Sequence, residues 1–132
     1  MAKDLDSARY ISFVSYKRDG SPVPTAVWVV PFEDGYAFTT DPDAWKVKRV
    51  LRDPNVTVQT SNVRGRPKNG APIHRGRAVV LSEAQVGGVR LALRRKYWFA
   101  YRVLFGISEW RSTRRGGAPT VGTAAIKVVL DA

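Results

Sequence analysis

Three short runs of β-type residues, separated by tight turn signals, fill the first part of the chain and constrain the fold most strongly. The runs and the dipeptides between them are residues 9–17, Asp19-Gly20, residues 23–32, Asp34-Gly35 and residues 36–40. Asp-Gly between such runs is typical of β-hairpins, so the pattern predicts an antiparallel β-meander. The second run is so rich in apolar residues that we expect a central strand covered on both faces.

The rest of the chain alternates between helical and β-type patterns. Asp41-Pro42 resembles an N-cap followed by proline at the first helical position, so we expect a short helix to begin there. Ser82-Glu83 opens a longer amphipathic helix. Further strands are expected at residues 55–62, 72–81 and 120–130. Six strands and two helices predict a mainly β fold, a small antiparallel barrel with helices at its openings.

Length and cysteine content restrict the class of protein. The chain has 132 residues, enough for a single domain over residues 1–132 that buries roughly two-thirds of its unfolded surface. It has no cysteine and one histidine, which excludes thiolate metal sites, thiol nucleophiles and metal clusters built on several histidines. We expect no metal site. Without a signal-like apolar core or an apolar run of roughly 20 residues, we expect a soluble, cytoplasmic protein without membrane insertion.

The charge balance calls for an anionic partner. Lysine and arginine number 22 against 11 aspartate and glutamate, a formal net charge of +11. Nucleic acid, an anionic membrane surface and a polyanionic small molecule all satisfy such a charge. Composition alone favours nucleic acid, so the positions of the cations must decide.

The stretch from Thr39 to Arg49 has the composition of a phosphate site. The end of a strand supplies two hydroxyls, Thr39 and Thr40. The start of the following helix supplies three cations, Lys46, Lys48 and Arg49. Hydroxyls, ammonium groups and free helix N–H groups can donate together to phosphate oxygens. Asp41 and Asp43 would compete for the same donors at the tip of the helix. An ordinary solvated basic helix is an equally good interpretation of the residue types alone.

Five motifs occur in a specific order along the first two-thirds of the chain. They are Tyr10-Ile11-Ser12-Phe13, residues 18–28, Phe38-Thr39-Thr40, residues 46–50 and Arg52-Asp53-Pro54-Asn55-Val56. Together they resemble the pyridoxamine 5'-phosphate oxidase-like split β-barrels of the flavin/deazaflavin oxidoreductase superfamily, most closely the branch that uses the deazaflavin coenzyme F420. The resemblance implies a six-stranded antiparallel split β-barrel with F420, or alternatively FMN, as cofactor.

The resemblance also implies a cofactor site. It places the ring beside β-strand residues 25–28 and the phosphate at the helix start, with Lys46 as the principal phosphate residue. Trp45 stands where the family usually has a small residue, and its bulk could cover the phosphate. The implied cofactor-binding residues are Thr25, Val27, Trp28, Thr39, Thr40, Trp45, Lys46, Lys48, Arg49, Arg64 and Arg66, with Lys68 also available for the oligoglutamate tail of F420.

The activity implied by the resemblance is hydride transfer between the deazaflavin C5 and an electron-poor substrate, in a homodimer. The cofactor carries this chemistry, so we name no catalytic side chain. The alternatives are an F420 carrier without turnover, an FMN-binding oxidase-like protein and a nucleic-acid-binding barrel, although the resemblance makes nucleic acid an unlikely partner.

Two further groups of residues have ordinary structural interpretations. We expect His74 to be a surface residue rather than a catalytic base. We expect the aromatic cluster Tyr97, Trp98, Phe99 and Tyr101 to form core or dimer interface rather than a stacking platform.

Overall fold

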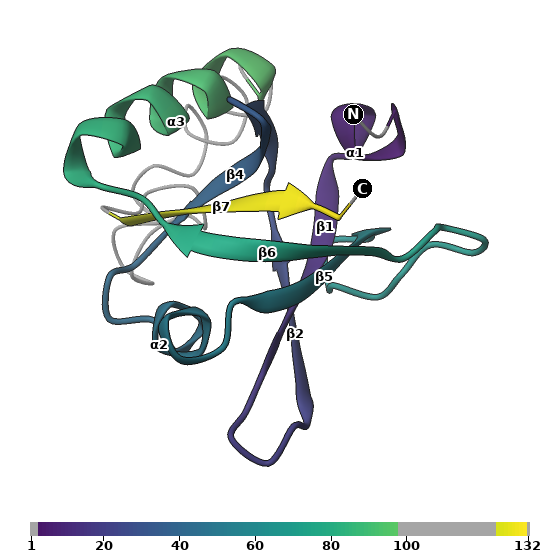
Figure 1. Ribbon diagram of the computed structural model, residues 1–132. Coiled ribbons are helices and arrows are strands. Elements are labelled where there is room, and N and C mark those ends of the chain that lie inside the picture. Colours follow the sequence, from purple (N-terminus) through teal and green to yellow (C-terminus); the bar gives the residue numbers. More distant parts are fainter. Residues whose placement is uncertain (1–2, 98–123, 132) are drawn as a thin grey trace, which may run out of the picture.

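A single antiparallel sheet with three helices makes up the part of the chain that the computed structural model describes, residues 3–97 and 124–131 (Figure 1). The elements are α1 (Lys3–Ser7), β1 (Tyr10–Tyr16), β2 (Pro22–Val27), β3 (Val30–Phe32), β4 (Gly35–Thr40), α2 (Trp45–Arg52), β5 (Asn55–Ser61), β6 (His74–Val80), α3 (Glu83–Lys96) and β7 (Ala124–Leu130). The predicted strands at 9–17, 36–40 and 55–62 are therefore confirmed to within one residue.

The sheet has seven strands rather than the predicted six, because the run 23–32 divides at Trp28-Val29 into two strands. The strand order is β2-β1-β5-β6-β7-β4-β3, so the two halves of this run form the two opposite edges. The expectation of one central strand was wrong. Proline lacks the N–H that a central strand must donate, and Pro24 and Pro31 fit edge positions. The apolar residues of this run instead fill the cores where the chain bends.

The sheet curls on itself as a split barrel. Phe13 on β1 and Phe38 on β4 are separated by three strands in the sheet, yet their ring centroids lie 4.8 Å apart in an edge-to-face contact. Such a contact requires the sheet to bend until distant strands face each other. The inner core so formed is closed at one end by Leu5 of α1 and at the other by Val47 and Val50 of α2.

The three helices differ from prediction in number and in one boundary. The short helix α1 was not predicted. Helix α2 begins at Trp45, not at Asp41-Pro42, because Asp41 closes a turn instead: its Oδ1 accepts a hydrogen bond from the Asp43 amide at 3.1 Å. The start of α3 is confirmed by a capping box in which Gln85 folds back onto Ser82.

A second core lies between α3 and the outer face of β3, β4 and β7. Val86, Val89 and Leu93 of α3 are buried there, and Tyr97 stacks on Trp28 at 4.4 Å between ring centroids. The Tyr97 hydroxyl bonds to the backbone of Val29, and burial raises the pKa of Tyr97 to about 12. Its predicted core role is confirmed, whereas Trp98, Phe99 and Tyr101 lie outside the described residues. No helix among residues 3–97 and 124–131 is both long and apolar enough to span a bilayer.

Candidate functional site

Helix α2 presents cations on every side that does not face the inner core. Val47 and Val50 are buried, and the remaining positions include Lys46, Lys48, Arg49 and Arg52. Two of these cations are held against β1. Arg49 Nε donates to the buried Ser15 Oγ at 2.7 Å, and Arg52 Nη2 donates to the Tyr16 carbonyl oxygen.

An open pocket of about 740 Å³ lies between α2 and the hairpin that joins β1 to β2. Its lining consists of one aromatic residue and five cations: Trp45, Lys48, Arg49 and Arg52 from the helix, with Lys17 and Arg18 from the hairpin. Figure 1 shows this hairpin projecting from the sheet on the side of α2. No carboxylate of residues 3–97 and 124–131 lines this α2 pocket, so its chemistry favours an anionic ligand.

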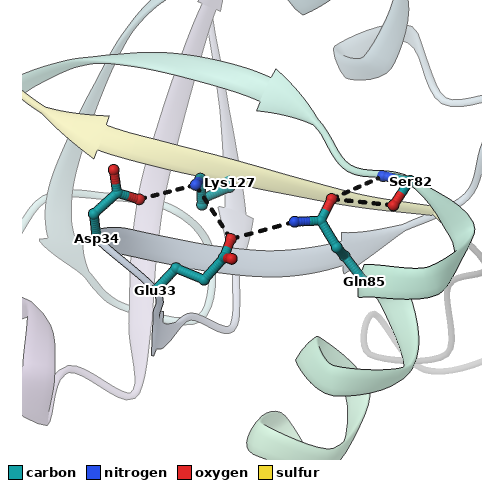
Figure 2. Close-up of polar contacts among 5 residues, drawn as sticks. All are labelled: Glu33, Asp34, Ser82, Gln85 and Lys127. Carbon is teal, nitrogen blue, oxygen red and sulfur yellow. Dashed lines mark hydrogen bonds and ion pairs between the residues drawn. The ribbon is translucent and has the colours of Figure 1, made fainter.

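The five cations of the α2 pocket take part in no ion pair with the described part of the chain. The ion pairs found there are His74 with Asp4, and Lys127 with Glu33 and Asp34 (Figure 2). Carboxylates that neighbour the pocket residues in sequence are engaged elsewhere. Asp19 Oδ1 accepts from Ser21, which lowers the Asp19 pKa, and Asp53 Oδ1 accepts from Asn55. No ion pair within the described part of the chain therefore compensates the charge of the pocket, and the one carboxylate that interacts with a pocket cation is Asp19, whose pKa Lys17 lowers slightly further.

Lys46 lies on a different side of α2 and does not line the α2 pocket. Its side chain is half-buried, and burial lowers the pKa of Lys46, with repulsion from Arg49 as the smaller cause. Burial also lowers the pKa of Arg49. An anion placed between these two cations would favour the charged form of both. Among the predicted residues, the structure brings Trp45, Lys48 and Arg49 together in the α2 pocket, with Lys48 Nζ 4.6 Å from the Trp45 ring centroid. Lys46 is near enough to Arg49 for the two positive charges to repel each other.

Thr39 and Thr40 are buried at the end of β4, where they pair with Ala125 and Ala124 of β7. The turn at residues 41–44 then leads directly into α2. Two hydroxyls thus precede the cationic helix, as the sequence predicts, although no described contact joins them to its cations.

The residues predicted to lie beside a cofactor ring have three different environments. Thr25 is half-buried on β2, and its Oγ1 is 3.4 Å from the Phe13 carbonyl oxygen. Val27 belongs to the inner core, and Trp28 belongs to the second core under α3. Their proximity to a cofactor ring stays a prediction.

Arg64 and Arg66 lie on the exposed loop between β5 and β6, away from the lining of the α2 pocket. The Asn62 side chain accepts hydrogen bonds from both of their amides and shapes the loop. Gly65, with φ of +80°, packs against the backbone of Ala26 on β2. The loop therefore carries its cations, including exposed Lys68, beside β2, and their role in binding a tail stays a prediction.

Sequence reasoning missed three residues of the α2 pocket: Lys17, Arg18 and Arg52. Arg52 follows Trp45 by seven positions, so helical periodicity places both on one face once the helix start is known. Lys17 and Arg18 gave no such signal, because only the tertiary fold brings the hairpin to α2.

His74 is half-buried rather than a plain surface residue. Its Nε2 lies 2.9 Å from Asp4 Oδ2, a contact that joins β6 to α1. That His74 is not a catalytic base stays a prediction. No group of three metal-ligating side chains converges among residues 3–97 and 124–131.

Comparison with known proteins supports the fold. No family model and no curated protein sequence matches the chain. Among solved structures, it is similar to an F420 reductase, with 18% identity and a TM-score of 0.64, covering 98% of this chain and 93% of that one. It is also similar to a Listeria innocua protein that is provisionally assigned as a pyridoxamine 5'-phosphate oxidase. The two share 15% identity with a TM-score of 0.57, and the match covers 97% of this chain and 88% of that one. The heme storage protein HutZ from Vibrio cholerae shares 12% identity with a TM-score of 0.63, and the match covers 98% of this chain and 87% of that one.

These similarities define the fold and nothing finer. The chain has the split-barrel fold of pyridoxamine phosphate oxidase-like proteins, a fold shared by proteins named for F420, for pyridoxamine phosphate and for heme. One fold carrying several chemistries means that function must be argued from the site.

Proposed function

We propose that the protein binds a phosphate-bearing deazaflavin or flavin cofactor, coenzyme F420 foremost, and uses it for hydride transfer to an electron-poor organic substrate. One observation carries the proposal: helix α2 of a split barrel follows the buried hydroxyls Thr39 and Thr40 after a short turn, and its Lys46 and Arg49 form no ion pair within the described chain. Ammonium, guanidinium and hydroxyl donors in this arrangement fit a phosphate.

Each group has a distinct part in holding the cofactor. Lys46 supplies a point charge whose cationic form the phosphate stabilises against burial. Arg49 is already oriented by Ser15 and supplies its remaining N–H donors. When bound, the deazaflavin or flavin supplies the hydride chemistry, so the chain's own task is to bind, orient and exclude water. The exposed cations Arg64, Arg66 and Lys68 serve anionic groups remote from the ring.

The test is titration of the purified protein with F420 and, separately, with FMN at moderate salt, followed by fluorescence. We expect Lys46→Ala to weaken binding about tenfold or more, the loss expected for one charge-assisted contact. Arg90→Ala, which removes an exposed α3 cation, is the matched control and should bind as the wild type does. Binding of neither ligand, or a heme absorption band formed with hemin instead, would overturn the proposal.

Turnover and assembly need separate measurements. Reduced F420 consumed in the presence of an activated alkene or nitro compound supports an enzyme, whereas tight binding without consumption supports a carrier. A yellow protein with a flavin spectrum supports FMN as the cofactor.

We propose a homodimer in which both protomers shape each cofactor site. Light scattering during gel filtration measures the mass of the particle, and the mass of a single chain would contradict the homodimer.

A further inference from the structure

The α2 pocket offers more positive charge than the cofactor proposal uses. Lys17, Arg18 and Arg52 have no part in that proposal, and Lys46, on which it depends, does not line the pocket. Residues of two elements distant in sequence thus converge on a separate concave surface. Five cations without a carboxylate repel one another, so the surface is most stable when an anion occupies it.

We propose that the α2 pocket is a second binding site, for a nucleoside di- or triphosphate. The phosphate chain lies along Lys17, Arg18, Lys48, Arg49 and Arg52, and the base lies against Trp45. This proposal is independent of the redox cofactor, although Arg49 borders both sites.

The number and type of cations favour adjacent phosphates over a single one. A lone phosphate carries a charge of about −1.5 to −2 at neutral pH, which leaves most of the five positive charges unmatched. Guanidinium groups match phosphate oxygens in a two-pronged geometry, and three of the five cations are arginines. A chain of phosphates satisfies them together.

Two of the arginines are already oriented for a ligand. Arg49 uses Nε to bind Ser15, and Arg52 uses Nη2 to bind the Tyr16 carbonyl, so each retains further N–H donors. Neither partner carries a charge, so the positive charge of each arginine remains available. Fixing the side chains before binding reduces the entropy lost when the ligand arrives.

Trp45 explains why a nucleoside, rather than inorganic polyphosphate, fits best. Its side chain is 70% exposed, although it forms one wall of the pocket. Lys48 Nζ lies 4.6 Å from the ring centroid, a cation–π contact that helps to fix the indole. Aromatic surfaces beside cations stack nucleic-acid bases. The volume of about 740 Å³ lies within the range of roughly 300–1,000 Å³ typical of small-molecule sites.

Calorimetric titration with ATP, tripolyphosphate and inorganic phosphate, without magnesium and at about 0.15 M salt, tests this proposal. We expect ATP to bind about tenfold or more tightly than inorganic phosphate, and more tightly than tripolyphosphate. Lys17→Gln/Arg18→Gln should weaken ATP binding about tenfold or more, because it removes two of the five cations of the pocket. The fold should be kept, because both side chains are exposed and form no hydrogen bond or ion pair with the described chain. Arg90→Gln/Arg94→Gln on α3 removes the same charge and should change little. Trp45→Ala should remove the advantage of ATP over tripolyphosphate.

Several results would overturn the proposal. They are equal affinity for ATP and inorganic phosphate, equal losses in the hairpin and α3 variants, no effect of Trp45→Ala, or a single-stranded oligonucleotide that binds more tightly than ATP. Failure here is distinguishable from failure of the cofactor proposal. Lys46→Ala should weaken F420 binding and spare ATP binding, whereas Lys17→Gln/Arg18→Gln should do the reverse.

Discussion

Two charged regions of the molecule differ in whether their cations form ion pairs. Lys127 on β7 binds Asp34 at 2.8 Å and Glu33 at 3.2 Å, and Glu33 in turn accepts from Gln85 at the start of α3 (Figure 2). The α2 pocket gathers five cations, and no carboxylate of the described residues lines it. The first region ties the turn between β3 and β4 to β7 and α3, whereas the cations of the second form no ion pair within the described chain.

The contrast shows where a strongly basic chain places its few acidic groups. Carboxylates at the β3–β4 turn complete contacts between elements far apart in sequence, so their role is structural. The cations near α2 are oriented by neutral groups, a hydroxyl and a carbonyl, which keep them in place without cancelling their charge. Substitutions in the first region should therefore change stability, and those in the second should change anion binding.

Gly35→Ala should give the largest change in the free energy of unfolding, and it tests the region around the β3–β4 turn directly. A Cβ at Gly35, the first residue of β4 and the neighbour of Asp34, would overlap the carbonyl oxygen of Val128 and push β4 away from β7. We expect the free energy of unfolding to fall by about 3 kcal/mol, measured by urea denaturation followed by circular dichroism. Gly87→Ala on α3, where nothing lies within 4 Å, should instead stabilise by about 0.5–1 kcal/mol. Similar results for both variants would contradict this view of the β3–β4 turn.

Charge reversal at one lysine in each region should give effects of opposite sign. Lys127→Glu places a third carboxylate beside Glu33 and Asp34, so we expect the melting temperature to fall by several degrees. Lys48→Glu loses the cation–π contact with exposed Trp45 but removes repulsion in the pocket. It also places a glutamate four residues before Arg52, a pair that stabilises a helix by about 0.2–0.5 kcal/mol. Differential scanning calorimetry measures the melting temperatures of both variants. Equal destabilisation by the two reversals would show that the charge of Lys48 contributes as much to folding as that of Lys127.

The smallest effect concerns the pKa values of two lysines. Hydrogen bonding to Asp34 raises the pKa of Lys127, whereas burial and Arg49 lower the pKa of Lys46. The contribution of Lys127 to stability is present below the ordinary lysine pKa of 10.5 and is lost as pH rises through its folded value. Lys46 has the opposite sign, because the folded state binds fewer protons, so its contribution rises with pH up to 10.5.

Titration of the lysine side chains by NMR tests this difference. Lys46 should lose its proton at lower pH than Lys127, and Arg49→Gln should move the Lys46 pKa upward, while Arg90→Gln should leave it unchanged. A Lys46 that titrates together with Lys127 would remove the electrostatic distinction between the two regions.

Local signals were sufficient where the interaction that decides the structure is itself local. The strands at residues 9–17 and 36–40 follow from their residue types and from turns between them, and Ser82 with Gln85 marks the start of α3 within four residues. Local signals failed at Asp41-Pro42, since an aspartate that closes a turn and one that caps a helix look alike in sequence.

The sequence by itself determined an antiparallel β fold, a cationic helix after a hydroxyl-bearing strand and a strong excess of positive charge, because these depend on residue type and short-range spacing. Only the tertiary structure decided that residues 23–32 form both edges of one curled sheet, since apolar content cannot tell a central strand from a chain that crosses between two cores. It also decided that Lys17 and Arg18 join α2 while Lys46 faces elsewhere, because a pocket is made by surfaces that meet in space and leave no periodic pattern in the chain.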